Sequence, residues 1–232
     1  MTNDKLAPKK EPIKITGKPN ASALHSRLAE AVAQDEILAQ ADPLVVPNRI
    51  AIMPDASGSM SGYKNQCLHE ALTSFINMCD FANTSIAFYS FGQRPEIRFD
   101  LSRNKQMLLL TAGGVQASGG TPMAEAMADV LGTISLTRAI IISDGCADSP
   151  TECTDIAQGY ADNETPIDCI HIGNETYGED LLKEIARLTG GIYIKFTDVT
   201  SFSKAFSYLT PAKRGELNSA IAGLLGAAEI KL

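Results

Sequence analysis

The feature that most constrains the fold is a regular alternation between short apolar, β-forming runs and segments with helical periodicity. Apolar runs of this kind predict buried strands, and the periodic segments between them predict amphipathic helices. The predicted strands cover residues 50–53, 84–91, 96–99, 138–143, 167–172 and 192–196. The predicted helices cover residues 64–81, 104–111, 122–134, 151–161 and 178–188. Strands that alternate with helices favour a parallel α/β sheet covered on both faces, with right-handed crossovers.

One connection departs from this pattern. The runs 84–91 and 96–99 are separated only by a short segment that contains Pro95. So short a link cannot hold a crossover helix, and it favours an antiparallel hairpin. We therefore expect a mostly parallel, six-stranded sheet with one antiparallel edge strand.

The segments outside this alternation divide the chain further. Residues 1–19 are rich in Lys and Pro and are expected to form a flexible N-terminal arm. Residues 20–46 are expected to hold a leading amphipathic helix and a Pro-containing linker. The main domain is predicted to span residues 47–210, with a further helix near Phe202, and a tail helix is predicted within residues 211–232.

Composition excludes several classes of protein. The formal net charge of −7 and the lack of a basic cluster beyond the N-terminal arm argue against nucleic-acid binding. No apolar run is long enough to span a membrane, and the N-terminus lacks the apolar core of a signal peptide. The five cysteines include no C-x-x-C pair, so we expect free thiols in a reducing compartment rather than disulfides or a zinc site. These features predict a cytoplasmic protein, or one inside a virion or other assembly.

The first predicted strand ends at an unusual polar sequence, Asp55-Ala-Ser57-Gly-Ser59. A carboxylate and two hydroxyls at alternate positions put three oxygens on one side of a tight loop. Such a loop lies at the carboxyl end of a strand, where open α/β sheets bind their ligands. Oxygen-only donors suit a hard cation such as Mg²⁺, so the sequence predicts a metal site here.

Two later loops carry oxygen ligands in matching places. Thr121 follows Gly119-Gly120 at the start of a predicted helix, and Asp144 ends the most apolar strand in Ser143-Asp144-Gly145. With these three pieces in order, the chain resembles the von Willebrand factor A (integrin I-like) domain family. The metal-ion-dependent adhesion site of that family has the pattern Asp-x-Ser-x-Ser, then Thr, then Asp. The resemblance covers residues 47–210 and implies a Rossmann-like, doubly wound sheet.

The resemblance also implies roles for the five matched residues. Ser57 and Ser59 would bind Mg²⁺ or Mn²⁺ directly, Thr121 directly or through water, and Asp55 and Asp144 largely through water. Neutral hydroxyls next to the ion leave it under-neutralised, so an acidic side chain of a partner protein can complete its coordination. The glycine-rich segment 113–120 and the helix near Phe202 would be the elements that move when Thr121 approaches the metal.

Two residues of these loops need separate comment. Pro54 precedes Asp55, and because proline cannot donate to a strand ladder, we expect it just past the last paired residue of the strand. Cys146 lies two residues after Asp144, on the rim of the predicted site. It is expected to be an unreactive thiol, and a redox effect on partner binding is the alternative.

The same residues also allow other interpretations. Ser59 or Ser61 could cap the helix that follows, and Thr121 could cap the helix after it, but capping would not explain the whole set. The segment from Gly114 to Thr121 imitates a phosphate-binding loop but has Gly120 where the required Lys would stand. A haloacid dehalogenase-type phosphatase would need a second aspartate at position 57, where this chain has Ser57.

The predicted function is therefore a Mg²⁺-dependent protein-interaction module with no catalytic residues. Its partner could be a AAA+ ATPase or a subunit of a bacterial or phage assembly, and a structural role in a virion or injection machine is a variant. A metal-dependent hydrolase or phosphatase is the main alternative, but the three motif loops contain no Lys, Arg or His to act as base or charge stabiliser. The histidines His25, His69 and His171 are scattered along the chain. A surface adhesin is a further alternative.

Overall fold

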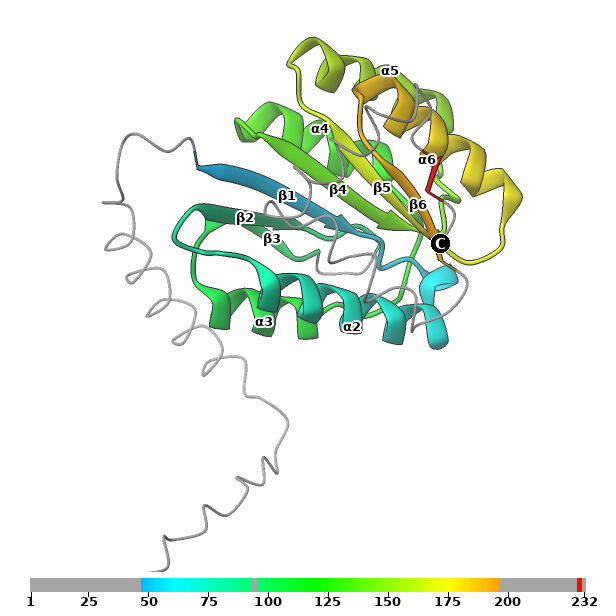
Figure 1. Cartoon of the computed structure of the whole chain (residues 1–232). Coiled ribbons are helices and arrows are strands. Elements are labelled where there is room, and N and C mark those ends of the chain that lie inside the picture. The colour runs from blue at the N-terminus through cyan, green and yellow to red at the C-terminus, as the bar shows by residue number, and fades with distance from the viewer. Residues whose placement is uncertain (1–46, 93–95, 197–228, 231–232) are drawn as a thin grey trace, which may run out of the picture.

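The computed structural model describes residues 47–92, 96–196 and 229–230. Within these ranges the chain forms one twisted sheet with the strand order β3-β2-β1-β4-β5-β6-β7 (Figure 1). The strands are β1 (Asn48–Pro54), β2 (Thr84–Tyr89), β3 (Arg98–Ser102), β4 (Arg138–Ser143), β5 (Ile167–Ile172), β6 (Tyr193–Phe196) and β7 (Glu229–Ile230). Only β3 is antiparallel to its neighbour. The predicted doubly wound sheet of six main strands with an antiparallel strand is confirmed, and the two-residue β7 adds to it.

Helices cover both faces of the sheet, as the alternating sequence predicts. They are α2 (Tyr63–Met78), α3 (Lys105–Gly113), α4 (Met123–Thr133), α5 (Pro150–Asp162) and α6 (Thr176–Thr189), with a short 3-10 turn, η1, at Gly58–Met60. α2 and α3 pack on one face, and α4, α5 and α6 pack on the other (Figure 1). The predicted leading helix, the helix near Phe202 and the main part of the predicted tail helix lie outside the described residues.

Two separate apolar layers hold the sheet between the helices. Alternate residues of β1 point to opposite faces, so Ile50 and Ile52 join the layer beneath α2, whereas Ala51 and Met53 join the layer beneath α4 and α6. These side chains are at most 1% exposed. A strand buried on both faces has no polar side, which explains why its sequence is continuously apolar rather than alternating.

The position of Pro54 differs from the sequence prediction. Pro54 is the last residue of β1 and still lies in register with Ile142 of β4. Its carbonyl accepts a hydrogen bond from Phe91 N–H at 3.2 Å, and the ladder continues where Asp55 N–H donates to Ile142 O at 2.8 Å. The strand therefore tolerates the lost proline donor, because the neighbouring hydrogen bonds hold the backbone on both sides of it.

Candidate functional site: three loops at the carboxyl ends of the strands

The first loop follows β1 and turns back sharply on itself. Asp55 Oδ1 accepts a hydrogen bond from Ser57 N–H at 2.8 Å, and the hydroxyls of Ser57 and Ser59 lie 3.0 Å apart. A carboxylate that binds the backbone two residues on stabilises such a turn. Asp55 and Ser57 are buried, whereas Ser59 is exposed. The loop thus gathers three oxygen-bearing side chains and opens to the surface at Ser59.

The loop after β4 joins the first loop through direct side-chain contacts. Ser143 Oγ donates to Asp55 Oδ2 at 2.5 Å and accepts a hydrogen bond from Gly145 N–H at 2.8 Å. Ser59 also interacts with the carboxylate of Asp144 and helps to lower its pKa. Since β1 and β4 are parallel neighbours, their carboxyl ends meet at one edge of the sheet. The structure therefore brings Asp55, Ser57, Ser59 and Asp144 together at this edge.

The loop that carries Thr121 is held to both of the others. Backbone hydrogen bonds join it to the first loop, with Ser118 N–H donating to Ala56 O at 2.7 Å and Gly58 N–H donating to Gly119 O at 3.0 Å. Thr121 N–H donates to Asp148 Oδ2 at 2.9 Å, and Asp148 N–H donates back to Thr121 O at 3.1 Å. Thr121 therefore lies between the first loop and the loop after β4.

Glycine allows the close approach of these loops. Gly92, which follows β2, has a φ of +106°, and a Cβ on it would lie 2.5 Å from Ser57 N. Gly119 has a φ of +80°, and a Cβ on it would lie 2.2 Å from Gly92 O. Because L-residues with a side chain rarely adopt such φ values, both positions need glycine.

Helix capping does not account for the hydroxyls. α2 begins after Gly62 and has no side-chain cap, and α4 begins after Pro122, also without one. Ser59, Ser61 and Thr121 therefore do not serve as the caps that the alternative interpretation required. The hydroxyls of Ser57 and Ser59 instead face one another within the first loop.

The two carboxylates have opposite electrostatic surroundings. Burial raises the pKa of Asp55 to about 6, although hydrogen bonds from Ser143 and Ser57 act in the other direction. Burial would also raise the pKa of Asp144, but its hydrogen bonds with Lys64 and Ser59 outweigh this effect and leave the pKa below its ordinary value. Two carboxylates so near each other favour a cation between or beside them.

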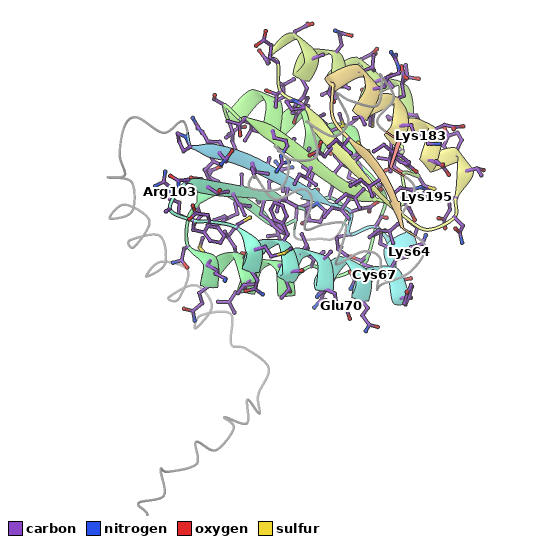
Figure 2. The ribbon with its side chains drawn as sticks, in the orientation of Figure 1. Lys64, Cys67, Glu70, Arg103, Lys183 and Lys195 are labelled. Carbon is purple, nitrogen blue, oxygen red and sulfur yellow. The ribbon has the colours of Figure 1, made fainter. Side chains whose placement is uncertain are left out.

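Sequence reasoning missed Lys64 and Glu175. Lys64 lies in the first turn of α2, and its Nζ is 2.9 Å from Asp144 Oδ2 and 2.7 Å from Glu175 Oε1. The three motif loops carry no basic residue, but the helix that follows the first loop brings one to the site (Figure 2). The lack of Lys, Arg and His in the motif loops therefore does not leave the site without a basic residue. The sequence did offer one signal for Lys64, because it lies in the first helical turn after the first loop.

The donor set suits a hard divalent cation. Hydroxyls and carboxylates are oxygen ligands, which Mg²⁺ and Mn²⁺ prefer over nitrogen or sulfur. Within the described ranges, no group of three or more His, Cys, Asp or Glu side chains is suited to hold a metal. The ammonium of Lys64 at Asp144 shows that this edge of the sheet attracts positive charge. The residues fit a hydroxyl-rich Mg²⁺ site rather than a zinc site.

The other candidate reactive residues lie elsewhere or are unsuited to chemistry. His69 Nε2 lies 2.7 Å from Val115 O, and His171 Nδ1 lies 2.9 Å from the Tyr193 hydroxyl. Burial, together with the charge of Asp144, raises the pKa of the Cys146 thiol. A thiol with a raised pKa is a poor nucleophile near neutral pH, as expected for an unreactive cysteine.

Comparison with known proteins gives a consistent family signal. The family model described as von Willebrand factor type A domain matches residues 48–194. A search of curated proteins gave no significant match.

Solved structures share the fold. A von Willebrand factor type A protein from Catenulispora acidiphila has a TM-score of 0.61 at 22% identity, over 73% of this chain and 43% of its own length. This chain thus spans less than half of that protein. BatB from Bacteroides thetaiotaomicron has a TM-score of 0.61 at 15% identity, over 74% of this chain and 99% of its own. Manganese-loaded TRAP protein from Plasmodium vivax has a TM-score of 0.56 at 17% identity, over 72% and 74%.

Proposed function

Since the chain belongs to the von Willebrand factor type A domain family, we propose that it is a protein-interaction module that depends on Mg²⁺ or Mn²⁺. Domains of this family are generally interaction modules rather than enzymes. The metal would complete an adhesion site of the kind that the sequence pattern predicts. Its chemistry is to offer positive charge to an acidic side chain of a partner.

One observation carries this proposal: the convergence of Asp55, Ser57, Ser59 and Asp144, with the loop of Thr121 held to both neighbouring loops. Ser57, Ser59 and Thr121 would supply neutral hydroxyl oxygens, and Asp55 and Asp144 would supply the negative charge. Because Ser59 is exposed, a partner can reach the site there. Manganese in the TRAP protein of similar fold supports the choice of ion.

The partner is proposed to be a protein that presents Glu or Asp, such as a AAA+ ATPase or an assembly subunit. A structural role in a virion or injection machine would use the same contact. All five cysteines are free, which supports a reducing, cytoplasmic environment. Within the described residues, no helix is both long and apolar enough to cross a bilayer.

A hydrolytic enzyme is less well supported by the site. Metal-assisted hydrolysis needs a base and a charge-stabilising cation that can act on the substrate. Lys64 is already paired with Asp144 and Glu175. His69 contacts Val115 O, and His171 contacts the Tyr193 hydroxyl.

The first test is calorimetric titration of Mg²⁺ into the wild type and Asp55→Asn. We expect at least about tenfold weaker binding in the variant, since one site carboxylate loses its charge. Asn keeps a hydrogen-bonding group beside Ser143, so circular dichroism should show an intact fold. Asp129→Asn is the control, because Asp129 is 40% exposed and paired with Arg98 on the surface. Equal affinity in all three proteins would contradict the proposed site.

A pull-down from native lysate extends the test to function. A partner should be recovered with Mg²⁺ and lost with EDTA or with Asp55→Asn. An identical set of proteins under all conditions would indicate a metal that serves folding alone. Mg²⁺-dependent turnover of a phosphoester that requires Asp55 would instead favour the enzyme.

A further inference from the structure

Lys64 is a basic residue built into the predicted metal site. It comes from α2 rather than from a motif loop, and its Nζ contacts a carboxylate oxygen of Asp144 at 2.9 Å. Figure 2 shows Lys64 at the same end of the molecule as Lys195 and opposite Arg103. We propose that Lys64 competes with the divalent cation for Asp144 and thereby weakens metal binding. The inference rests on the proposed function, because it concerns the same site.

The position of Lys64 is fixed by a second carboxylate. Glu175, just before α6, contacts Lys64 Nζ at 2.7 Å through Oε1. A Cβ on Gly173 would lie 2.2 Å from Glu175 Oε2 and 3.2 Å from Lys64 Cε. The glycine thus leaves room for the ion pair. The side chain of Lys64 is only 20% exposed, so the ammonium is held against the site rather than free in solvent.

The ammonium of Lys64 is paired with both carboxylates, at 2.9 Å from Asp144 Oδ2 and 2.7 Å from Glu175 Oε1. Asp144 is fully buried, so its interaction with a cation is weakly screened by solvent. The ammonium therefore already neutralises a carboxylate that the metal would use.

This arrangement has a definite consequence for a divalent ion. An ion bound by Ser57, Ser59 and Asp144 would be repelled by the ammonium on that same carboxylate. It would also share the negative charge of Asp144 with Lys64. Both effects weaken metal binding and leave more positive charge on the ion for an acidic partner.

A purely structural role for Lys64 makes the opposite prediction for metal affinity. If Lys64 only held the Asp144 loop in place, its loss would loosen the loop and weaken metal binding. If it competes, its loss should strengthen metal binding. Both roles predict lower stability without metal, because Asp144 would lose its partner. The direction of the change in Mg²⁺ affinity separates the two.

The experiment is titration of Mg²⁺ into the wild type, Lys64→Met and Lys64→Gln, with Lys183→Met as the matched control. Met keeps most of the length of the side chain without its charge, and Gln, which is also shorter than Lys, keeps a hydrogen-bond donor. Lys183 pairs with Glu179 within α6 at 2.8 Å, so its loss removes an ion pair that does not include Asp144. Thermal unfolding in EDTA and in Mg²⁺ gives a second readout.

We expect both Lys64 variants to bind Mg²⁺ on the order of tenfold more tightly than the wild type. They should melt at a lower temperature in EDTA and gain more from Mg²⁺, whereas Lys183→Met should keep the wild-type affinity. Equal or weaker Mg²⁺ binding by a folded Lys64→Gln would overturn competition while leaving the proposed function standing. A wild type that binds no Mg²⁺ would overturn both.

Discussion

At the scale of single residues, the surroundings of two aspartates shift their pKa values in opposite directions. Asp55 and Asp144 are both fully buried. Burial raises the pKa of Asp55 to about 6, whereas for Asp144 the effect of burial is outweighed by hydrogen bonds with Lys64 and Ser59. Burial thus disfavours the charged form of Asp55, whereas the charge of Asp144 is stabilised by Lys64. Lys64 is therefore part of the site although it is not one of the five motif residues.

His171 is a second buried residue whose charge is controlled by its surroundings. It is 0% exposed in β5, and its Nδ1 lies 2.9 Å from the Tyr193 hydroxyl. Its Nε2 is buried with no hydrogen-bond partner in the part of the chain that the structure describes. Burial and the charge of Lys195 lower its pKa, against the opposing effect of three nearby acidic side chains, Glu179, Glu175 and Asp144.

This environment predicts a loss of stability in mild acid. Because the folded pKa of His171 lies below its unfolded value of about 6.5, the unfolded state binds the proton first as pH falls. The contribution of His171 is thus complete at about pH 7.5 and reduced at about pH 5.5, below the unfolded pKa. Urea unfolding of the wild type and His171→Gln at both pH values measures it.

The comparison must be made between the two proteins, because Asp55 acts in the opposite direction. Its raised pKa adds stability as pH falls through about 6. That contribution is common to the wild type and His171→Gln, so it cancels in their difference. If the two proteins lose equal stability between the two pH values, His171 is not the titrating group.

At the scale of elements, the start of α6 is packed directly on the loop that carries Asp144. A Cβ on Gly178 would lie 2.0 Å from Asp144 O, and a Cβ on Gly145 would lie 2.3 Å from Gly178 O. The backbones of the helix and the loop are therefore in contact. This contact fixes where Asp144 can lie relative to the first loop.

Gly178→Ala should consequently destabilise the protein by about 1–3 kcal/mol, since the new methyl group overlaps backbone atoms that must shift. It should also weaken Mg²⁺ binding. Gly132→Ala is the matched control, because a Cβ at that helical position meets nothing within 4 Å. That change should stabilise α4 by up to about 1 kcal/mol. Thermal unfolding checks both, and equal stability of the two variants would show that the backbone contact is unimportant.

At the scale of the whole molecule, the alternation of strands and helices was enough to predict the sheet and the covering of both faces. It worked because the buried strands are mostly apolar and the segments between them bury apolar side chains at helical spacing. Boundaries were less accurate. The hairpin strand predicted at residues 96–99 lies at Arg98–Ser102, and its pairing with β2 has an irregularity between Ile86 and Phe88.

The candidate site was predicted only as far as its motif loops. Asp55, Ser57, Ser59 and Asp144 could be placed together because parallel strands end at a common edge. Lys64 was missed although it lies just after the first loop, and Glu175 was missed because it belongs to none of the three motif loops. Pro54 was misplaced because its tolerance depends on hydrogen bonds from Phe91 and to Ile142, which local sequence does not reveal.

The most direct test of the metal site is a crystal structure obtained in the presence of Mn²⁺, with anomalous scattering used to locate the ion. We expect an anomalous peak at the Ser57 and Ser59 hydroxyls, next to Asp55 and Asp144 and within reach of Thr121. A peak at another part of the surface would contradict it. So would the absence of a peak while the loops of Asp55 and Asp144 keep the arrangement described.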